Sequence, residues 1–150
     1  MKPIHAAAAA LALALSPAFA MPALASEDIA DQYPQSELYS KPVEFIPHVF
    51  SAIGATAPPT YENSGHNNNL SFVITGDGVL VVNGGASYRL AKALHDEIKS
   101  ITDQPVKLVV NENGQGHAFL GNSYWAEQGV DILAHVDAIH EIEEEGDFVL

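Results

Sequence analysis

The chain has 150 residues, no cysteine and a strong excess of acid, with 19 Asp and Glu against 6 Lys and Arg and a net charge of −13. The lack of cysteine excludes disulfides, thiolate catalysis and iron–sulfur clusters. The negative charge repels phosphate backbones and excludes nucleic acid as an expected partner, while a hydrophobic content of 47% excludes wholesale disorder.

Residues 1–25 have the layout of a cleavable signal peptide. Lys2 precedes the uncharged run 6–15, and Ser16-Pro17 then ends any helix. Two small-x-small cleavage sites follow, and we expect cleavage at the second, after Ala25, because polar sequence begins directly behind it. An apolar run of about 10 residues is far shorter than the roughly 20 that span a bilayer. The sequence therefore predicts a periplasmic or secreted protein with no membrane anchor after cleavage.

The next part of the chain predicts little regular structure. Residues 26–42 have no sustained hydrophobic period and indicate an extended arm. Apolar residues recur from Val43 to Ile53 around Pro47, which favours an edge strand or two short strands, because proline cannot donate to a central ladder. Residues 54–69 are rich in Pro, Gly and Asn and predict a loop.

From residue 70 onward the pattern alternates between strands and helices. It predicts a hairpin, a helix capped by Ser87, a strand, a short helix capped by Asn122, another strand and a last helix. The expected ranges are Leu70–Thr75, Val79–Val82, 88–101, Val106–Val110, Ser123–Gln128, Val130–Ala134 and Asp137–Glu145. Residues 147–150 have the pattern of a beginning strand. This order indicates a mixed sheet covered by helices.

Ligands bind at the carboxyl ends of the strands in such sheets, and two loops occupy those positions. They are Asn83–Ser87 and Asn111–Gly121, and the second holds three glycines and His117 between a buried strand and a helix cap. Asn83, Gly85 and His135, which ends a later strand on the same side, are candidate ligand-binding residues there.

These features resemble the metallo-β-lactamase fold family, in particular its exported hydrolases associated with quinoprotein systems. The resemblance covers roughly residues 43–137. It rests on the order and spacing of Glu62–Gly65, Ser71–Val79, Ser87–Leu90, Thr102–Val106 and Leu120–Asn122. It implies an α/β fold in which residues 43–150 form a truncated, metallo-β-lactamase-like half domain, a mixed β-sheet with helices packed on it.

The resemblance also implies a zinc site, whose ligands this chain has changed. The family motif His-x-His-x-Asp-His binds one or two zinc ions that activate a water for hydrolysis. An ungapped alignment on the Gly121 segment puts Asn113 and Gln115 on the first two His positions, His117 on Asp and Ala118 on the last His, and a one-residue gap moves His117 onto that last His.

An earlier strand-end Asp of the family is also replaced, by Asn83. Neutral amides are poor zinc ligands, so we expect a hydrolase-like protein that is not active as a zinc hydrolase. No cofactor is expected, unless zinc is held in an altered form of the site.

Alternative hypotheses stay open. An active hydrolase with a relocated metal site would use His117, His135 and His66. A non-catalytic module would bind a small molecule or a protein. A fragment of a longer protein would expose an apolar sheet face that a protein partner covers.

Overall fold

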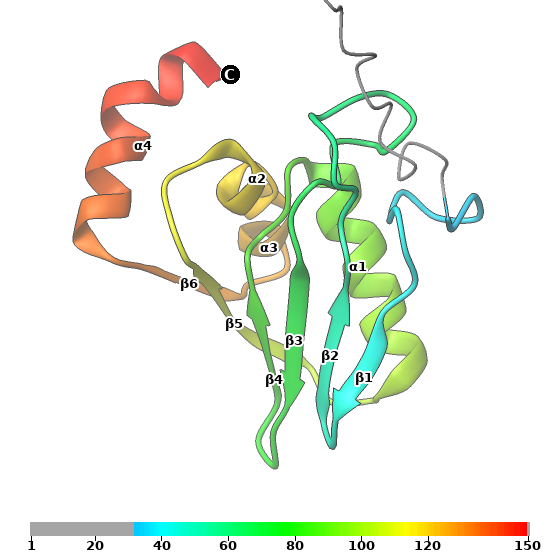
Figure 1. Cartoon of the computed structure of the whole chain (residues 1–150). Coiled ribbons are helices and arrows are strands. Elements are labelled where there is room, and N and C mark those ends of the chain that lie inside the picture. The colour runs from blue at the N-terminus through cyan, green and yellow to red at the C-terminus, as the bar shows by residue number, and fades with distance from the viewer. Residues whose placement is uncertain (1–31, 150) are drawn as a thin grey trace, which may run out of the picture.

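The computed structural model describes the backbone of residues 32–149 and the side chains of residues 32–144. The predicted signal peptide, residues 1–25, lies outside these residues. The described elements form one six-stranded sheet with helices packed on it (Figure 1). They are β1 (Val43–Ile46), β2 (Val49–Ala52), β3 (Leu70–Ile74), β4 (Val79–Val82), α1 (Tyr88–Ile101), β5 (Val106–Asn111), α2 (Gly116–Phe119), α3 (Asn122–Glu127), β6 (Asp131–Ala134) and α4 (Val136–Val149).

The sheet is mixed, as the sequence predicts. Strands β1 to β4 pair antiparallel with their neighbours, whereas β4, β5 and β6 pair parallel. The strands lie in chain order, so each connection joins neighbouring strands. Because β4, β5 and β6 run in the same direction, their carboxyl ends meet at one edge of the sheet, where the two predicted ligand loops lie.

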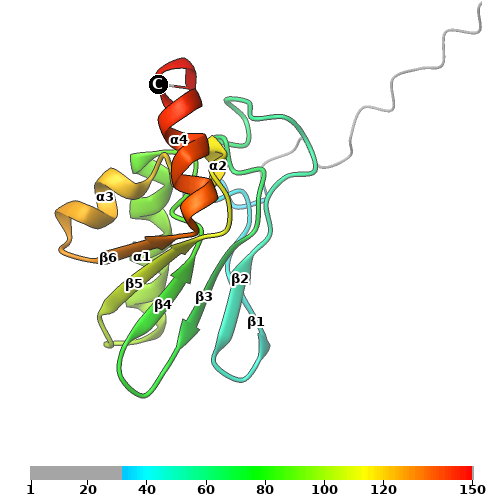
Figure 2. The ribbon, with the colours of Figure 1, turned by 90° about the vertical axis from the view of Figure 1, so that its left-hand side faces the viewer.

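Helices α1 and α3 cover one face of the sheet and enclose the core. Figure 2 shows both helices on the same side of the strands. Ser87 caps α1, and its hydroxyl accepts from the amide of Leu90 at 3.1 Å, as predicted. The fully buried side chains of the core come from the sheet and both helices and include Leu70, Phe72, Val81, Leu90, Leu94, Ile98, Val109 and Trp125.

Several boundaries differ from the predicted ones. Over residues 43–53 the sequence predicts either one edge strand or two short strands. The structure has two short strands, joined by a turn in which His48 has a φ of 71°. The predicted loop 111–121 contains the short helix α2. The N-cap residue of α3 is Gly121 and not the predicted Asn122. Asn122 is the first residue of the helix, and its side chain bonds to Asn111 instead of capping the helix.

The last helix is longer than predicted. Residues 147–149 belong to α4 and do not begin a strand. A strand needs a neighbour for its hydrogen bonds, whereas a helix makes these bonds within itself, so α4 extends without a pairing partner.

The described part of the predicted arm, residues 32–42, forms turns and bends rather than an extended segment. It packs Leu38 and Tyr39 into the interior, where they are 1% and 3% exposed. The Tyr39 amide donates to His66 Nδ1 at 2.9 Å, which ties the arm to the loop that follows β2. Among the described residues, no helix is both long enough and apolar enough to cross a membrane.

His66 is fully buried, and we expect it to make folding pH-dependent. Burial lowers the pKa of His66 from 6.5 to about 4, although the backbone carbonyls of Ala52 and Asn68 act in the opposite direction. The native state therefore holds the neutral imidazole, and protonation favours unfolding. The contribution of His66 to the free energy of unfolding is fully present above pH 6.5. It is lost as pH falls toward about 4, and the loss amounts to about 3 kcal/mol.

Chemical denaturation of the wild type and of His66→Gln measures this contribution. The variant keeps an acceptor for Tyr39 but cannot titrate, so the stability difference between the two proteins shrinks as pH falls through this range. A difference that is independent of pH would contradict the assignment.

Candidate functional site

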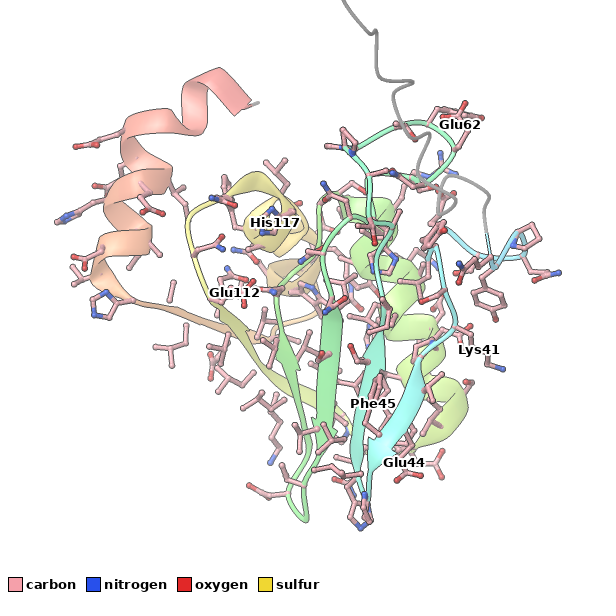
Figure 3. All side chains as sticks on the ribbon, viewed as in Figure 1. Lys41, Glu44, Phe45, Glu62, Glu112 and His117 are labelled. Atoms are coloured by element: carbon pink, nitrogen blue, oxygen red, sulfur yellow. The ribbon has the colours of Figure 1, made fainter. Side chains whose placement is uncertain are left out.

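The two loops predicted to bind ligands lie against each other at the carboxyl edge of β4 and β5. The amide of Gly84 donates to the carbonyl of Ala118 at 2.6 Å, and the amide of Gly121 donates to the carbonyl of Gly85 at 2.7 Å. The sequence prediction that these segments share one edge is therefore confirmed. Figure 3 shows Glu112, at the end of β5, and His117, on α2, at this edge.

Glycines allow the close approach of the two loops. A Cβ on Gly121 would lie 2.2 Å from the carbonyl oxygen of Gly84, and a Cβ on Gly84 would lie 2.3 Å from Asn122 Oδ1. Both distances are far shorter than a van der Waals contact, so any side chain at either position would separate the loops. Gly85 adds a φ of 98°, which an L-residue adopts only with strain.

Buried amide groups join these glycines. Asn111 is 3% exposed, accepts from the Gly84 amide at 3.1 Å and donates through Nδ2 to Asn122 Oδ1 at 3.2 Å. Asn83 is 2% exposed, and its Oδ1 accepts from the Glu112 amide at 3.2 Å. Trp125 Nε1 donates to the Gly84 carbonyl at 3.0 Å. We call Asn83, Gly84, Asn111, Gly121, Asn122 and Trp125 the amide–glycine cluster.

Sequence reasoning missed most of this cluster. It selected Asn83 and Gly85 as ligand-binding residues, but Asn83 is buried and its side chain bonds to backbone inside the protein. The sequence predicts Asn111 as the first residue of the second loop and Asn122 as a helix cap, with no contact between them. Their position eleven residues apart, at the two ends of a glycine-rich loop, was the available signal, but sequence alone does not show that both turn inward.

The residues between Asn111 and Asn122 have few side-chain groups that are free to bind a ligand. Asn113 Oδ1 accepts from the Gln115 amide at 2.9 Å, so it closes a local turn. Ala118 is fully buried and has no donor atom in its side chain. His117 lies on α2 and is partly exposed.

Helix α4 closes the loop from the other side. The Gly114 amide donates to Glu141 Oε2 at 3.0 Å. A Cβ on Gly114 would lie 2.7 Å from the carbonyl of Ala138 and 2.5 Å from Glu141 Cβ, so α4 packs directly on the loop backbone. The amide that the loop presents here is occupied by a carboxylate of the same chain.

Known structures share the fold of this chain. The chain is similar to the mono-zinc form of the metallo-β-lactamase FIM-1 from Pseudomonas aeruginosa, with a TM-score of 0.60 and 18% identity over 71% of this chain and 46% of that one. It is also similar to a metallo-β-lactamase from Pontibacter korlensis, with a TM-score of 0.60 and 20% identity over 71% and 48%. A third match, from Erythrobacter litoralis, has a TM-score of 0.58 and 15% identity over 70% and 45%.

The chain has a partial metallo-β-lactamase fold. It spans about half the length of the structures it matches. No family model matches the sequence, and no curated protein matches it.

The residues present do not fit the zinc site of a metallo-β-lactamase. Zinc is held by thiolate, imidazole or carboxylate, with at least three protein ligands even in open catalytic sites. Of the four aligned loop positions, only His117 has such a group. Within residues 32–144, no three His, Cys, Asp or Glu side chains lie together in a way that would hold a metal ion.

The structure does not gather the histidines proposed for a relocated site. His66 is buried under the arm, with Nδ1 accepting from Tyr39. His135 is exposed at the end of β6, and its Nδ1 accepts from the Asp137 amide at 3.2 Å. His117 forms no metal-binding group with them. The edge of this metallo-β-lactamase fold therefore offers backbone and amide hydrogen bonds rather than a cluster of metal ligands.

The glycine contact predicts a position-specific loss of stability. Gly121→Ala should lower the free energy of unfolding by about 2 kcal/mol or more, because the new methyl group overlaps the Gly84 carbonyl. Gly76→Ala is the matched control. A Cβ there meets nothing within 4 Å, and the change should stay within about 0.5 kcal/mol of wild type. Equal effects in urea denaturation would contradict the account of the cluster.

Proposed function

We propose that this protein is an exported, hydrolase-like protein of the metallo-β-lactamase fold that does not hydrolyse through a zinc-activated water and acts by binding. The observation that carries the proposal is the set of groups at the four aligned ligand positions. They are two amides, one imidazole and one methyl group, from Asn113, Gln115, His117 and Ala118.

The chemistry of these groups supports the loss of zinc. A complete structural zinc site is worth on the order of 10 kcal/mol, and most of that depends on deprotonated or imidazole ligands. Amide oxygens are weak donors to this ion, and Asn113 Oδ1 already accepts a backbone hydrogen bond. Ala118 is also enclosed, so an imidazole in its place would need new space.

The contacts around the loop support a structural use for the same segment. Glu141 binds the Gly114 amide, and Asn111 binds the Gly84 amide. The first bond joins the loop to α4, and the second joins the end of β5 to the loop that follows β4. The groups that are left at the edge, the exposed Glu112 and the partly exposed His117 among them, are polar and suit a small molecule or a protein surface (Figure 3).

The zinc content of the purified protein tests the proposal that it is not a zinc hydrolase. After dialysis against buffer, the full chain should hold well below one zinc per molecule and should not turn over a lactam, ester or thioester substrate faster than His117→Ala does. Stoichiometric zinc that is lost in His117→Ala, but kept in the control His140→Ala on α4, would overturn the proposal.

A gain-of-ligand variant checks that the edge is otherwise competent to receive a metal. Asn113→His with Gln115→His places three imidazoles in the loop together with His117, and zinc affinity should rise by about tenfold or more. A wild type that already binds as tightly as this variant would contradict the argument from amide chemistry.

Export has its own test. When the full chain is expressed in a Gram-negative bacterium, the protein should appear in the periplasmic fraction with Ser26 as its first residue, because the second small-x-small site lies directly before it. A cytoplasmic protein that keeps residues 1–25 would refute this part of the proposal. Cleavage after Ala20 would support export but correct the site.

A further inference from the structure

Two Asn-Gly pairs lie at the carboxyl edge of the sheet, and they differ in their surroundings. They are Asn83-Gly84, which follows β4, and Asn113-Gly114, which follows β5. An asparagine before a glycine can react with its own main chain, because the glycine nitrogen can attack the side-chain carbonyl carbon and close a five-membered imide ring. Glycine favours this attack because it has no Cβ to shield the nitrogen. The contacts around each pair therefore decide how readily it reacts.

The attacking nitrogen of the Asn113-Gly114 pair has a base beside it. The Gly114 amide, which must lose its proton during the attack, donates to Glu141 Oε2 at 3.0 Å. A carboxylate at this distance is within the reach that a general base needs. Helix α4 holds it there, because the space beside the Gly114 Cα is filled by the Glu141 Cβ and the Ala138 carbonyl. Figure 1 shows α4 beside this loop.

The carbonyl group that is attacked is polarised by a neighbouring amide. Asn113 Oδ1 accepts from the Gln115 amide at 2.9 Å. Negative charge develops on Oδ1 during the attack, and an amide that already donates to this atom stabilises the charge, as in an oxyanion hole. The turn that this bond closes also folds the Asn113 side chain back along the peptide that follows it. The loop thus supplies the nucleophile, the carbonyl and the oxyanion donor, and α4 supplies the base.

We propose that Asn113 is a site of self-catalysed deamidation, with Glu141 as the general base. The Gly114 nitrogen forms a bond to Asn113 Cγ while Glu141 takes the amide proton. The bond between Cγ and the side-chain nitrogen then breaks, and ammonia leaves with the proton that Glu141 held. A water molecule next adds to one of the two imide carbonyls and opens the ring. One water is consumed and one ammonia is released, and position 113 becomes aspartate or isoaspartate.

The Asn83-Gly84 pair has an oxyanion donor but lacks the other two requirements. Asn83 Oδ1 accepts from the Glu112 amide at 3.2 Å, so the carbonyl is polarised here too. The Gly84 amide, however, donates to two neutral carbonyl groups, which are much weaker bases than a carboxylate. Asn83 is also only 2% exposed, whereas Asn113 is half-buried, so water has access to Asn113 alone. The first pair is therefore an internal control for the second.

The reaction removes a contact that holds α4 on the loop. The imide nitrogen carries no hydrogen, so the bond from Gly114 to Glu141 is lost when the ring closes. An isoaspartate then adds one carbon to the main chain, next to a glycine that has no room even for a Cβ. We therefore expect α4 to loosen from the carboxyl edge. Its amides should exchange with solvent faster in the converted protein than in the fresh protein.

Peptide mapping by mass spectrometry follows the reaction as the full chain ages in neutral buffer. The peptide with Asn113 should gain the mass difference between an amide and an acid, while the peptide with Asn83 stays unchanged. Glu141→Gln should slow the conversion by about tenfold or more, because an amide accepts the hydrogen bond but does not take the proton. Glu143→Gln removes the same charge from an exposed site on α4 and should react at the wild-type rate. No conversion of the wild type, or conversion of Glu141→Gln at the wild-type rate, would overturn the proposal.

Comparison of the folded and unfolded wild type decides the question if Glu141→Gln does not fold. In guanidinium chloride both Asn-Gly pairs lose their surroundings, so they should react at similar rates. Folding should raise the rate at Asn113 above that value and lower the rate at Asn83. A rate at Asn113 that is equal or lower in the folded chain would show that the structure does not promote the reaction and would refute catalysis by Glu141. This inference does not depend on the zinc argument.

Discussion

Two backbone segments touch at the carboxyl edge of the sheet, and the rest of the edge is arranged around this contact. Gly84 and Gly121 approach so closely that neither position has room for a Cβ. The approach leaves polar backbone groups buried, and a buried amide without a partner costs about 1–3 kcal/mol. The Gly84 amide donates to the Ala118 carbonyl and to Asn111, and the Gly84 carbonyl accepts from Trp125. The cluster therefore ties the loops after β4 and β5 to each other and to α3.

Internal hydrogen bonds also hold the loop between β5 and α3 against its neighbours. The Asn111 and Asn122 side chains bond to each other, and Glu141 from α4 takes the Gly114 amide on the far side. The Asn111 and Asn122 side chains and the Gly114 amide thus have partners within the protein. The same groups are then not free to coordinate an ion.

Sequence patterns predicted the sheet well and its polar edge poorly. The strands β3 to β6 and the helix α1 follow from hydrophobic period, turn residues and the Ser87 cap, which act over a few residues. The inward turn of Asn83 depends on a contact with a segment 29 residues away, and that of Asn122 on a contact with Asn111 across the loop, and no local pattern encodes either contact. The strand predicted to begin over residues 147–150 was wrong for residues 147–149, for the same reason, since a strand exists only where a neighbour pairs with it.

A zinc titration followed by ¹⁵N–¹H NMR tests the central claim most directly. It observes the amides of Gly84, Gly114 and Gly121, whose hydrogen bonds within the protein define the edge. The account predicts that these resonances keep their positions when one equivalent of zinc is added. Slow-exchange shifts of all three, together with the His117 imidazole, would show that the edge receives a metal ion and would contradict it.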